Sequence, residues 1–464
     1  MNPTSSTSAS TAPASTAPGL VGPGTPEPSS ASVLDRTSAL SILERCDELA
    51  AHSTLRGGLI RRVYLSNEHR AVNDLAAQWM IEAGMHTWQD AAGNQCGRLE
   101  GRTPGLPALL LGSHLDTVPS AGRYDGILGV LTAIAVVDRI RESGVALPFA
   151  LEVVAFGDEE GTRFGRALLG SRALAGTFDP AWLDLADEDG VTLREAYRAF
   201  GLDAENAPAD EQLLHAARAG YTNPPGLAAS ARRPADLVGY LEAHIEQGPY
   251  LEEAGQPLGI VSSIAGARRF AITVTGQAGH SGTPFDRRHD ALAGASEIVT
   301  LIERTARDAG LIATVGHLEV FPDAVNVIPG RVELSLDLRA EFDDERDRVF
   351  AELERGMHAI AGIRGLTVSV RQTHNAPAVA CSPRLREAIA AGINATGETD
   401  PLLLLSRAGH DGMAVGEICE IAMLFIRCRG GVSHHPDEHV TEADVATATD
   451  AFEAAVLALV DARS

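Results

Sequence analysis

A polar stretch between two apolar segments constrains the fold of this chain more than any other feature. Residues 106–111 (LPALLL) form an apolar run short enough for a buried strand, and residues 127–142 have the apolar spacing of a packed helix. Between them, His114, Asp116 and Asp125 lie on the loop that leaves the strand. Open α/β sheets place their ligand sites on such loops. Taken alone, the stretch is equally compatible with a solvated polar turn.

Length and composition narrow the possible classes of protein. A chain of 464 residues, 45% of them hydrophobic, is long for one core, so we expect two domains. The net charge of -24 argues against nucleic acid or an anionic membrane as partner. No run approaches the roughly 18 to 20 apolar residues that would span a membrane.

Cysteine usage and the first residues bear on localisation. The five cysteines are scattered and include no CxxC pair, which predicts reduced thiols in a cytoplasmic protein rather than disulfides or a structural zinc site. Residues 1–33 are rich in Ser, Thr, Ala, Pro and Gly and lack the basic start and apolar core of a secretory signal. We interpret them as a disordered tail.

Alternating apolar and helical segments predict an α/β architecture for most of the chain. We expect helices at 34–51 and 67–83, a strand at 149–156, surface helices and loops at 179–238 with helical patches at 193–200 and 211–219, a strand at 402–405, a strand at 421–426, and helices from 383 and at 442–459. Residues 237–247 fit a strand, although a helix is nearly as compatible.

The pattern changes between these two parts. Residues 268–275 alternate strictly, and a helix at 287–309, strands at 311–321 and 331–338, a helix at 343–360 and a strand at 366–370 follow. This β-α-β-β-α-β order is that of the ferredoxin-like unit. We therefore predict an inserted domain at 263–376, within a larger domain formed by 34–262 and 377–464.

Five places concentrate metal-ligand side chains: His114, Asp125, Glu159-Glu160, His244 and Ser433-His434-His435-Pro436. Three or four of them follow predicted strand ends, so they can converge at one edge of a sheet. Histidines and carboxylates around a shared aspartate suit two divalent ions such as zinc, manganese, cobalt or nickel. Neither an HExxH zinc signature nor a GxSxG nucleophile motif is present in the sequence. For Glu159-Glu160, the alternative is a solvated acidic loop.

Eight ordered motifs resemble the hydantoinase/carbamoylase family of dinuclear-metal amidohydrolases, in the aminoacylase and carboxypeptidase superfamily. They are GSHLDTVPSAGRYDG, FGDEEGTRFG, EAHIEQGP, GQAGHSGTP, NVIPG, DLRA, AGHDGM and GGVSHHP. The resemblance covers nearly everything from about residue 55 onwards. It implies a mixed-sheet metallohydrolase domain and an inserted ferredoxin-like α+β lid and dimerisation domain.

The resemblance also implies roles for individual residues. His114, Asp125 and His244 would hold one metal ion, and Asp125 would bridge to a second ion held by Glu160 and His434. Glu159 would be the general base and later the acid. Asp116 would orient His114, although a turn-forming aspartate is the alternative. His435 is an alternative to His434, because adjacent histidines blur the alignment.

The substrate contacts implied by the resemblance lie further along the chain. Arg339 would clamp a carboxylate, unless it forms a surface ion pair with Glu333 or Glu341. The ureido group and the developing oxyanion would be bound by Gln247, Asn326 and His280, the histidine acting across a homodimer interface. Gly409 lies in the AGHDGM motif, where His410 and Asp411 would shape the pocket.

Two departures from the family pattern touch the substrate side. Arg407 replaces a glycine typical of carbamoylases, and the loop after His280 lacks one threonine.

The sequence thus predicts a homodimeric cytoplasmic amidohydrolase that acts on the ureido bond of a small carboxylate. Allantoate and N-carbamoyl-L-amino acids are the expected substrates, with allantoate favoured slightly by Arg407. The alternatives are an aminoacylase or dipeptidase that acts on an ordinary amide, and a catalytically silent binding protein.

Overall fold

The computed structural model describes residues 36–204 and 226–461. The predicted tail at 1–33 and the predicted helical patch at 211–219 lie outside the described residues. Within the described ranges, no helix is both long and apolar enough to cross a membrane.

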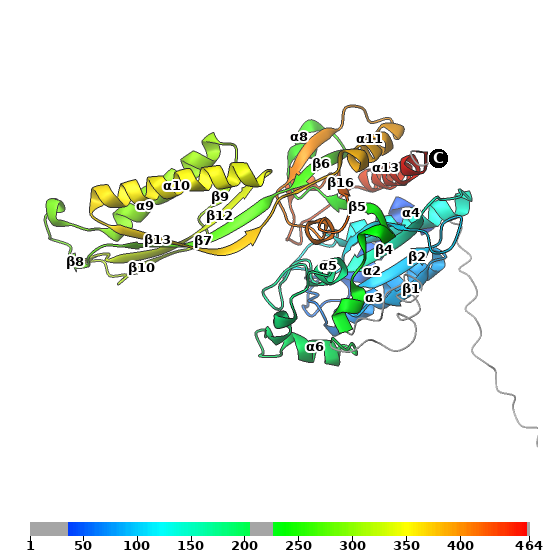
Figure 1. Cartoon of the computed structure of the whole chain (residues 1–464), viewed down its shortest axis with the longest axis horizontal. Helices are drawn as coiled ribbons and strands as arrows, with labels where there is room; N and C mark the ends of the chain where they lie inside the picture. Colours follow the sequence, from blue (N-terminus) through cyan, green and yellow to red (C-terminus); the bar gives the residue numbers. More distant parts are fainter. Residues whose placement is uncertain (1–35, 205–225, 462–464) are drawn as a thin grey trace, which may run out of the picture.

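Helices and strands alternate along most of the described chain (Figure 1). The α-helices are α2 (Ala39–Ala50), α3 (Asn67–Glu82), α4 (Ile127–Ser143), α5 (Leu169–Ala175), α6 (Leu193–Ala199), α8 (Tyr250–Ala254), α9 (Ala291–Asp308), α10 (Asp343–Arg364), α11 (Pro383–Ala395), α12 (Gly412–Val415) and α13 (Glu442–Asp461). The strands are β1 (His86–Gln89), β2 (Gln95–Leu99), β3 (Ala108–His114), β4 (Ala150–Phe156), β5 (Leu237–Ile245), β6 (Leu258–Ile264), β7 (Gly266–Thr275), β8 (Gly279–His280), β9 (Ile312–Thr314), β10 (Leu318–Phe321), β11 (Val327–Ile328), β12 (Arg331–Ala340), β13 (Thr367–Ala376), β14 (Val379–Ala380), β15 (Leu402–Ser406) and β16 (Ile421–Ile426).

A nine-stranded mixed sheet forms the centre of the larger unit. Its order is β1-β2-β4-β3-β5-β16-β6-β14, and β15 also pairs with β6. Strands β4, β3, β5 and β16 run parallel, whereas β2 and β6 pair antiparallel with this set. Both faces of β3 and β4 are buried, as expected for central strands connected through helices. Helix α4 packs on β3, β4 and β5, while α11 and α13 pack on each other and on β16.

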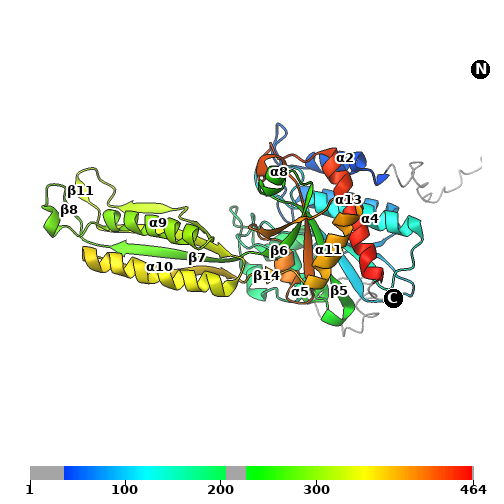
Figure 2. The ribbon, with the colours of Figure 1, turned by 90° about the horizontal axis from the view of Figure 1, so that it is seen from above.

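A five-stranded sheet, in the order β10-β12-β7-β13 with β9 also paired to β12, forms a smaller unit with its own apolar core. Helices α9 and α10 pack on each other and on this sheet. Burial alternates along β12, because one face of the sheet meets the helices and the other does not. Figures 1 and 2 show that this unit extends away from the large sheet, with β8 at its far end. The mixed-sheet α/β fold with a ferredoxin-like unit is confirmed.

Some predicted elements have different boundaries. The strand predicted at 311–321 is two strands, β9 and β10, because three residues (315–317) lie opposite two residues of β12 (335–336), which forms a bulge. The helix predicted from 287 begins at Ala291, where the Asp290 side chain accepts hydrogen bonds from two backbone N–H groups. The ambiguous segment at 237–247 is a strand, β5.

Several short strands were not predicted from the sequence: β1, β2, β6, β8, β11 and β14. The apolar run of β6 is too short for its periodicity to distinguish a strand from a helix. The two-residue strands exist only as pairing partners of distant segments, which local patterns do not reveal.

Candidate metal centre

The parallel arrangement of three central strands brings the predicted ligands together. Strand β3 lies between β4 and β5, and all three run in the same direction. His114 is the last residue of β3 and pairs with Phe156, the last residue of β4. His244 is the next-to-last residue of β5. The carboxyl ends of these strands therefore present His114, His244 and the loop with Glu159 at one edge of the sheet.

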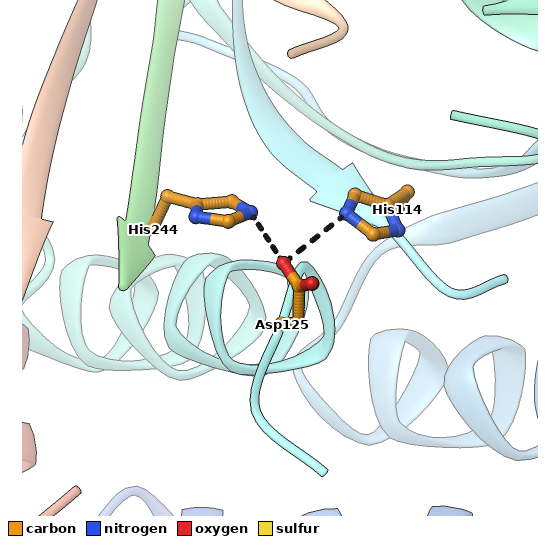
Figure 3. Close-up of side chains that lie close together, drawn as sticks. All are labelled: His114, Asp125 and His244. Atoms are coloured by element: carbon orange, nitrogen blue, oxygen red, sulfur yellow. Dashed lines mark ion pairs between the residues drawn. The ribbon is translucent and has the colours of Figure 1, made fainter. Parts of the chain in front are cut away.

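Asp125 lies between the two histidines (Figure 3). Its Oδ1 atom is 3.8 Å from His114 Nε2 and 3.2 Å from His244 Nε2. The three side chains are buried and offer ligand atoms within 4.8 Å of one another. A Cβ at Gly126 would overlap the His114 ring, and the positive φ of this residue also favours glycine. The backbone beside Asp125 thus makes room for the imidazole.

The two histidine rings present unprotonated nitrogens to Asp125 in their neutral forms. His114 Nδ1 is 3.1 Å from the carbonyl oxygen of Asp116, and His244 Nδ1 is 2.8 Å from that of Ile245. A carbonyl only accepts hydrogen bonds, so each Nδ1 carries the proton and each Nε2 keeps a lone pair. Two lone pairs and a carboxylate oxygen thus face one another, an arrangement that needs a shared proton or a cation.

A second group surrounds the other oxygen of Asp125. His434 Nε2 is 3.0 Å from Asp125 Oδ2 and 3.4 Å from Glu160 Oε1. The backbone of His434 has a φ of 55°, in the left-handed region that non-glycine residues rarely adopt. His435 instead lies near Asp437, with its side chain 59% exposed. The geometry therefore favours His434 over His435 as the histidine of this group.

Asp116 organises the loop that carries the two glutamates. Its Oδ1 accepts a hydrogen bond from the backbone N–H of Glu159 (3.0 Å), and its Oδ2 accepts one from that of Glu160 (3.2 Å). The same carboxylate is 3.6 Å from His114 Nδ1. Asp116 is completely buried, so it links β3 to the loop after β4 and is more than a turn-forming residue.

Burial and like charges shape the protonation of this site. Burial, together with Glu160 and other nearby carboxylates, raises the pKa of Glu159 well above its ordinary value. Burial opposes protonation of His244, but the negatively charged Asp125 carboxylate beside it outweighs this and raises the pKa of His244 to about 9. The hydrogen bond with Asp125 also raises the pKa of His434 to about 9. The field around Asp125 thus attracts positive charge.

Two predicted residues of the smaller unit lie far from this cluster in the same chain. His280 is in β8, which pairs with β11 at the far end of the unit (Figures 1 and 2). Its neighbour Ser281 donates a backbone hydrogen bond to the carbonyl of Asn326 (3.0 Å), and His280 and Asn326 are both exposed. The chain does not bring these two residues to its own Asp125.

Arg339 and Arg407 meet where the two units join. Arg339 Nε and Nη2 donate to the two carboxylate oxygens of Asp337 (3.0 and 3.2 Å), and Nη1 donates to the carbonyl of Arg407 (2.6 Å). The ion pair anticipated with Glu333 or Glu341 is formed with Asp337 instead. The Arg407 guanidinium lies 4.6 Å from the centre of the Tyr250 ring, a cation–π arrangement.

Gln247 and Gly409 border the cluster directly. Gln247 Nε2 donates to Asp125 Oδ2 (3.2 Å) and to Ser433 Oγ (3.0 Å). A Cβ at Gly409 would lie 3.8 Å from Glu159 Oε1, an ordinary van der Waals distance, so this exposed glycine lies directly beside Glu159.

Two buried acids next to the cluster were missed at the sequence level. Glu242 accepts a hydrogen bond from Ser113 Oγ (2.8 Å), and it forms with His244 and His410 a further group that could hold a metal ion. However, His410 Nε2 is already 2.7 Å from Ser406 Oγ. Glu438 contacts the loop that carries Asp125. Glu242 comes two residues before His244 on β5, and Glu438 comes four residues after His434. Neither spacing belongs to a known motif, so no signal in the sequence marks either acid.

Comparisons with known proteins agree with this geometry. The family model described as peptidase family M20/M25/M40 matches residues 110–458. The N-carbamoyl-L-amino acid amidohydrolase of Geobacillus stearothermophilus is 39% identical over 409 residues, which cover 88% of this chain and 95% of the relative. The allantoate deiminase of Arabidopsis thaliana is 37% identical over 419 residues, which cover 84% of this chain and 76% of the relative.

Solved structures show the same architecture. A hydantoinase/carbamoylase family amidase from Burkholderia multivorans has a TM-score of 0.80 at 32% identity, covering 91% of this chain and 98% of the other. The structure of AtUAH in complex with glyoxylate has a TM-score of 0.72 at 28% identity, covering 92% and 100%. The resemblance seen in the eight motifs is thereby confirmed, and the chain belongs to the peptidase family M20/M25/M40, among relatives that are amidohydrolases of the hydantoinase/carbamoylase type.

Proposed function

We propose that this protein is a metal-dependent amidohydrolase that cleaves the ureido C–N bond of a small carboxylate, such as allantoate or an N-carbamoyl-L-amino acid. The observation that carries the proposal is the position of Asp125. One of its oxygens faces His114 and His244, and the other faces His434 beside Glu160. Glu159, the residue before Glu160, is buried and close enough to feel the charges of Glu160 and Asp125. The relatives named for carbamoyl and allantoate hydrolysis support the same reaction.

The residues present fit two divalent ions. His114, Asp125 and His244 would hold one ion, and Asp125, Glu160 and His434 the other. The fit rests on the two Nε2 lone pairs that face Asp125 Oδ1, because a cation between them replaces their mutual repulsion by attraction. The nitrogen and oxygen donors suit zinc, manganese, cobalt or nickel.

When bound, two ions of this kind polarise a carbonyl and lower the pKa of a water molecule. Glu159 accepts the proton of the attacking water and later returns a proton to the departing nitrogen. Asp116 holds the backbone of Glu159, so the carboxylate keeps its orientation through both transfers. Hydrolysis forms one C–O bond, breaks one C–N bond of the ureido group and leaves ammonia and a carbamic acid. The carbamic acid then loses carbon dioxide, which breaks the second C–N bond, so a ureido acid plus water give the amine, carbon dioxide and ammonia.

The smaller unit, residues 263–376, would act as lid and dimerisation domain. We infer a homodimer, in which His280 and Asn326 of one protomer reach the oxyanion and ureido group in the site of its partner. Their exposed position at the far end of the unit supports this assignment. Arg339 would exchange part of its contacts with Asp337 and Arg407 for the substrate carboxylate, and Gln247 and Gly409 would border the ureido group.

The substrate side leaves a choice between ureido acids. The Arg407 guanidinium rests on Tyr250, so the slight preference for allantoate that was based on Arg407 has no support from this contact.

All five cysteines are free, which supports a reducing, cytoplasmic location.

The decisive experiment combines a substrate panel with one variant. Purified protein loaded with zinc or manganese is assayed for ammonia release from allantoate, N-carbamoyl-L-amino acids and ureidoglycolate, and for cleavage of N-acyl amino acids and dipeptides. We expect ammonia from ureido acids and a fall of 10²- to 10⁴-fold in kcat for Glu159→Gln, at unchanged metal content.

Other outcomes identify the alternatives. Cleavage of N-acyl amino acids or dipeptides without ammonia release would identify an aminoacylase or dipeptidase. Metal binding without turnover of any compound would identify a silent binding protein. Near-normal turnover in Glu159→Gln would refute the assignment of the base.

A further inference from the structure

Glu438 is a buried acid that joins two distant segments of the metal centre. Its side chain is 4% exposed. Glu438 Oε1 accepts hydrogen bonds from the backbone N–H groups of Tyr124 (2.8 Å) and Asp125 (3.2 Å). Glu438 Oε2 accepts a hydrogen bond from the hydroxyl of Ser433 (2.9 Å). One carboxylate thus holds the loop that presents Asp125 and the loop that presents His434.

The loop before Asp125 packs closely against the Glu438 side chain. A Cβ at Gly122 would overlap the Glu438 side chain, so the loop before Asp125 can approach only without a side chain at that position. Ser433 has a single hydroxyl proton, and its distance to Glu438 Oε2 (2.9 Å) is shorter than that to Asp125 Oδ2 (3.3 Å). We therefore assign the proton to Glu438, so the donor to Asp125 Oδ2 is Gln247 Nε2 (3.2 Å), and the same oxygen faces His434 Nε2 (3.0 Å).

The two halves of the centre depend on Glu438 to different degrees. His114 and His244 lie on β3 and β5, where the hydrogen bonds of the sheet hold them independently of Glu438. His434 lies on a loop, with a left-handed backbone and a half-exposed side chain. Its position relative to Asp125 Oδ2 is secured by the neighbouring Ser433 and by Glu438. A buried acid close to Asp125 is electrostatically unfavourable, and the three donors offset this cost.

We propose that Glu438 is a positioning residue that sets the separation of Asp125 Oδ2 and His434, and that its removal selectively weakens the ion held by Asp125, Glu160 and His434. The proposal rests on the proposed two-ion function. The ion held by His114, Asp125 and His244 should lose less affinity, because the sheet fixes its two histidines and only Asp125 lies on the loosened loop.

The first measurement needs no metal. Hydrogen–deuterium exchange of the metal-free chain follows peptides that span residues 119–128. Glu438→Ala removes the acceptor of two backbone N–H groups, so these peptides should exchange at least tenfold faster. Glu438→Gln keeps one acceptor oxygen for those groups and should remain within about threefold of the wild type. Asp437→Ala is the matched control, because the neighbouring Asp437 side chain is 80% exposed. Unchanged exchange in Glu438→Ala would overturn the proposal.

The second measurement separates the two ions. Calorimetric titration of the metal-free chain with Zn²⁺ should show two bound ions in the wild type, in Asp437→Ala and in Glu438→Gln. In Glu438→Ala one ion should lose at least tenfold more affinity than the other. Equal weakening of both ions, or no weakening, would contradict the selective role. If Glu438→Ala does not fold, Ser433→Ala replaces it and should weaken the same ion by a smaller factor; unchanged affinities would then refute the proposal.

Failure of the proposed function gives a different result. A wild type that binds no divalent ion would refute the two-ion centre, whereas faster exchange in Glu438→Ala would still establish the link between the two loops.

Discussion

Replacing Asp116 by asparagine tests how far the site depends on a residue that touches neither substrate nor, in our assignment, metal. The two carboxylate oxygens each accept one backbone N–H, from Glu159 at 3.0 Å and from Glu160 at 3.2 Å. An asparagine has only one acceptor oxygen. Whichever way its amide is turned, one N–H donor of the side chain faces one of these two backbone N–H donors.

The magnitude follows from these contacts. A hydrogen bond to a charged acceptor contributes about 1.5–3 kcal/mol, and a buried donor without an acceptor costs about 1–3 kcal/mol. The neutral asparagine regains part of this loss, because burial disfavours the charged carboxylate of Asp116 and raises its pKa, a cost that an uncharged side chain avoids. We therefore expect Asp116→Asn to lower the free energy of unfolding by about 1–3 kcal/mol. Displacement of Glu159 by a fraction of an ångström should lower kcat tenfold to a hundredfold.

Two assays measure these effects. Urea denaturation of the metal-free chain gives the free energy of unfolding, and ammonia release by the metal-loaded protein gives kcat. Asp189→Asn, at an exposed position, is the matched control and should change neither quantity. Surface substitutions usually change the free energy of unfolding by no more than about 0.5 kcal/mol. If Asp116→Asn changes it by no more than this and also keeps the wild-type kcat, the loop does not depend on Asp116 and our reasoning is refuted.

Three further predictions concern other parts of the molecule. Gly126→Ala should place a methyl group against the His114 ring and lower Zn²⁺ affinity at least tenfold in a metal titration, while far-UV circular dichroism stays unchanged; wild-type affinity would contradict this. Burial lowers the pKa of His69 from 6.5 to about 3, so between these pH values only the unfolded chain takes up this proton. The free energy of unfolding therefore decreases as pH falls from 6.5 towards 3, by at most about 5 kcal/mol. In His69→Asn the melting temperature should depend less on pH in this window, and a pH dependence parallel to that of the wild type would exclude His69 as the cause. Arg339→Lys loses the planar fork, so KM for ureido acids should rise at least tenfold with a smaller change in kcat, whereas an equal KM would exclude a carboxylate clamp.

The sequence predicted local structure well where local forces dominate. The apolar runs of β3 and β4 and the helix α4 were recognised because their residues are buried in a regular pattern. The serine before α3 caps that helix at the predicted start. The boundaries differed where a specific contact intervenes, such as the Asp290 cap of α9 or the bulge between β9 and β10.

The sequence by itself also predicted which side chains would carry the chemistry: a histidine and carboxylates at strand ends, two adjacent glutamates and a C-terminal pair of histidines. Only the tertiary structure decided how they meet. The order β4-β3-β5 brings His114, Glu159 and His244 to one edge, because hydrogen bonding between strands is independent of their order along the chain. The left-handed backbone of His434 turns this residue, and not His435, towards Asp125. Glu438 acquires its contacts with Tyr124 and Asp125 across 314 and 313 residues of sequence, a distance that no local pattern can encode.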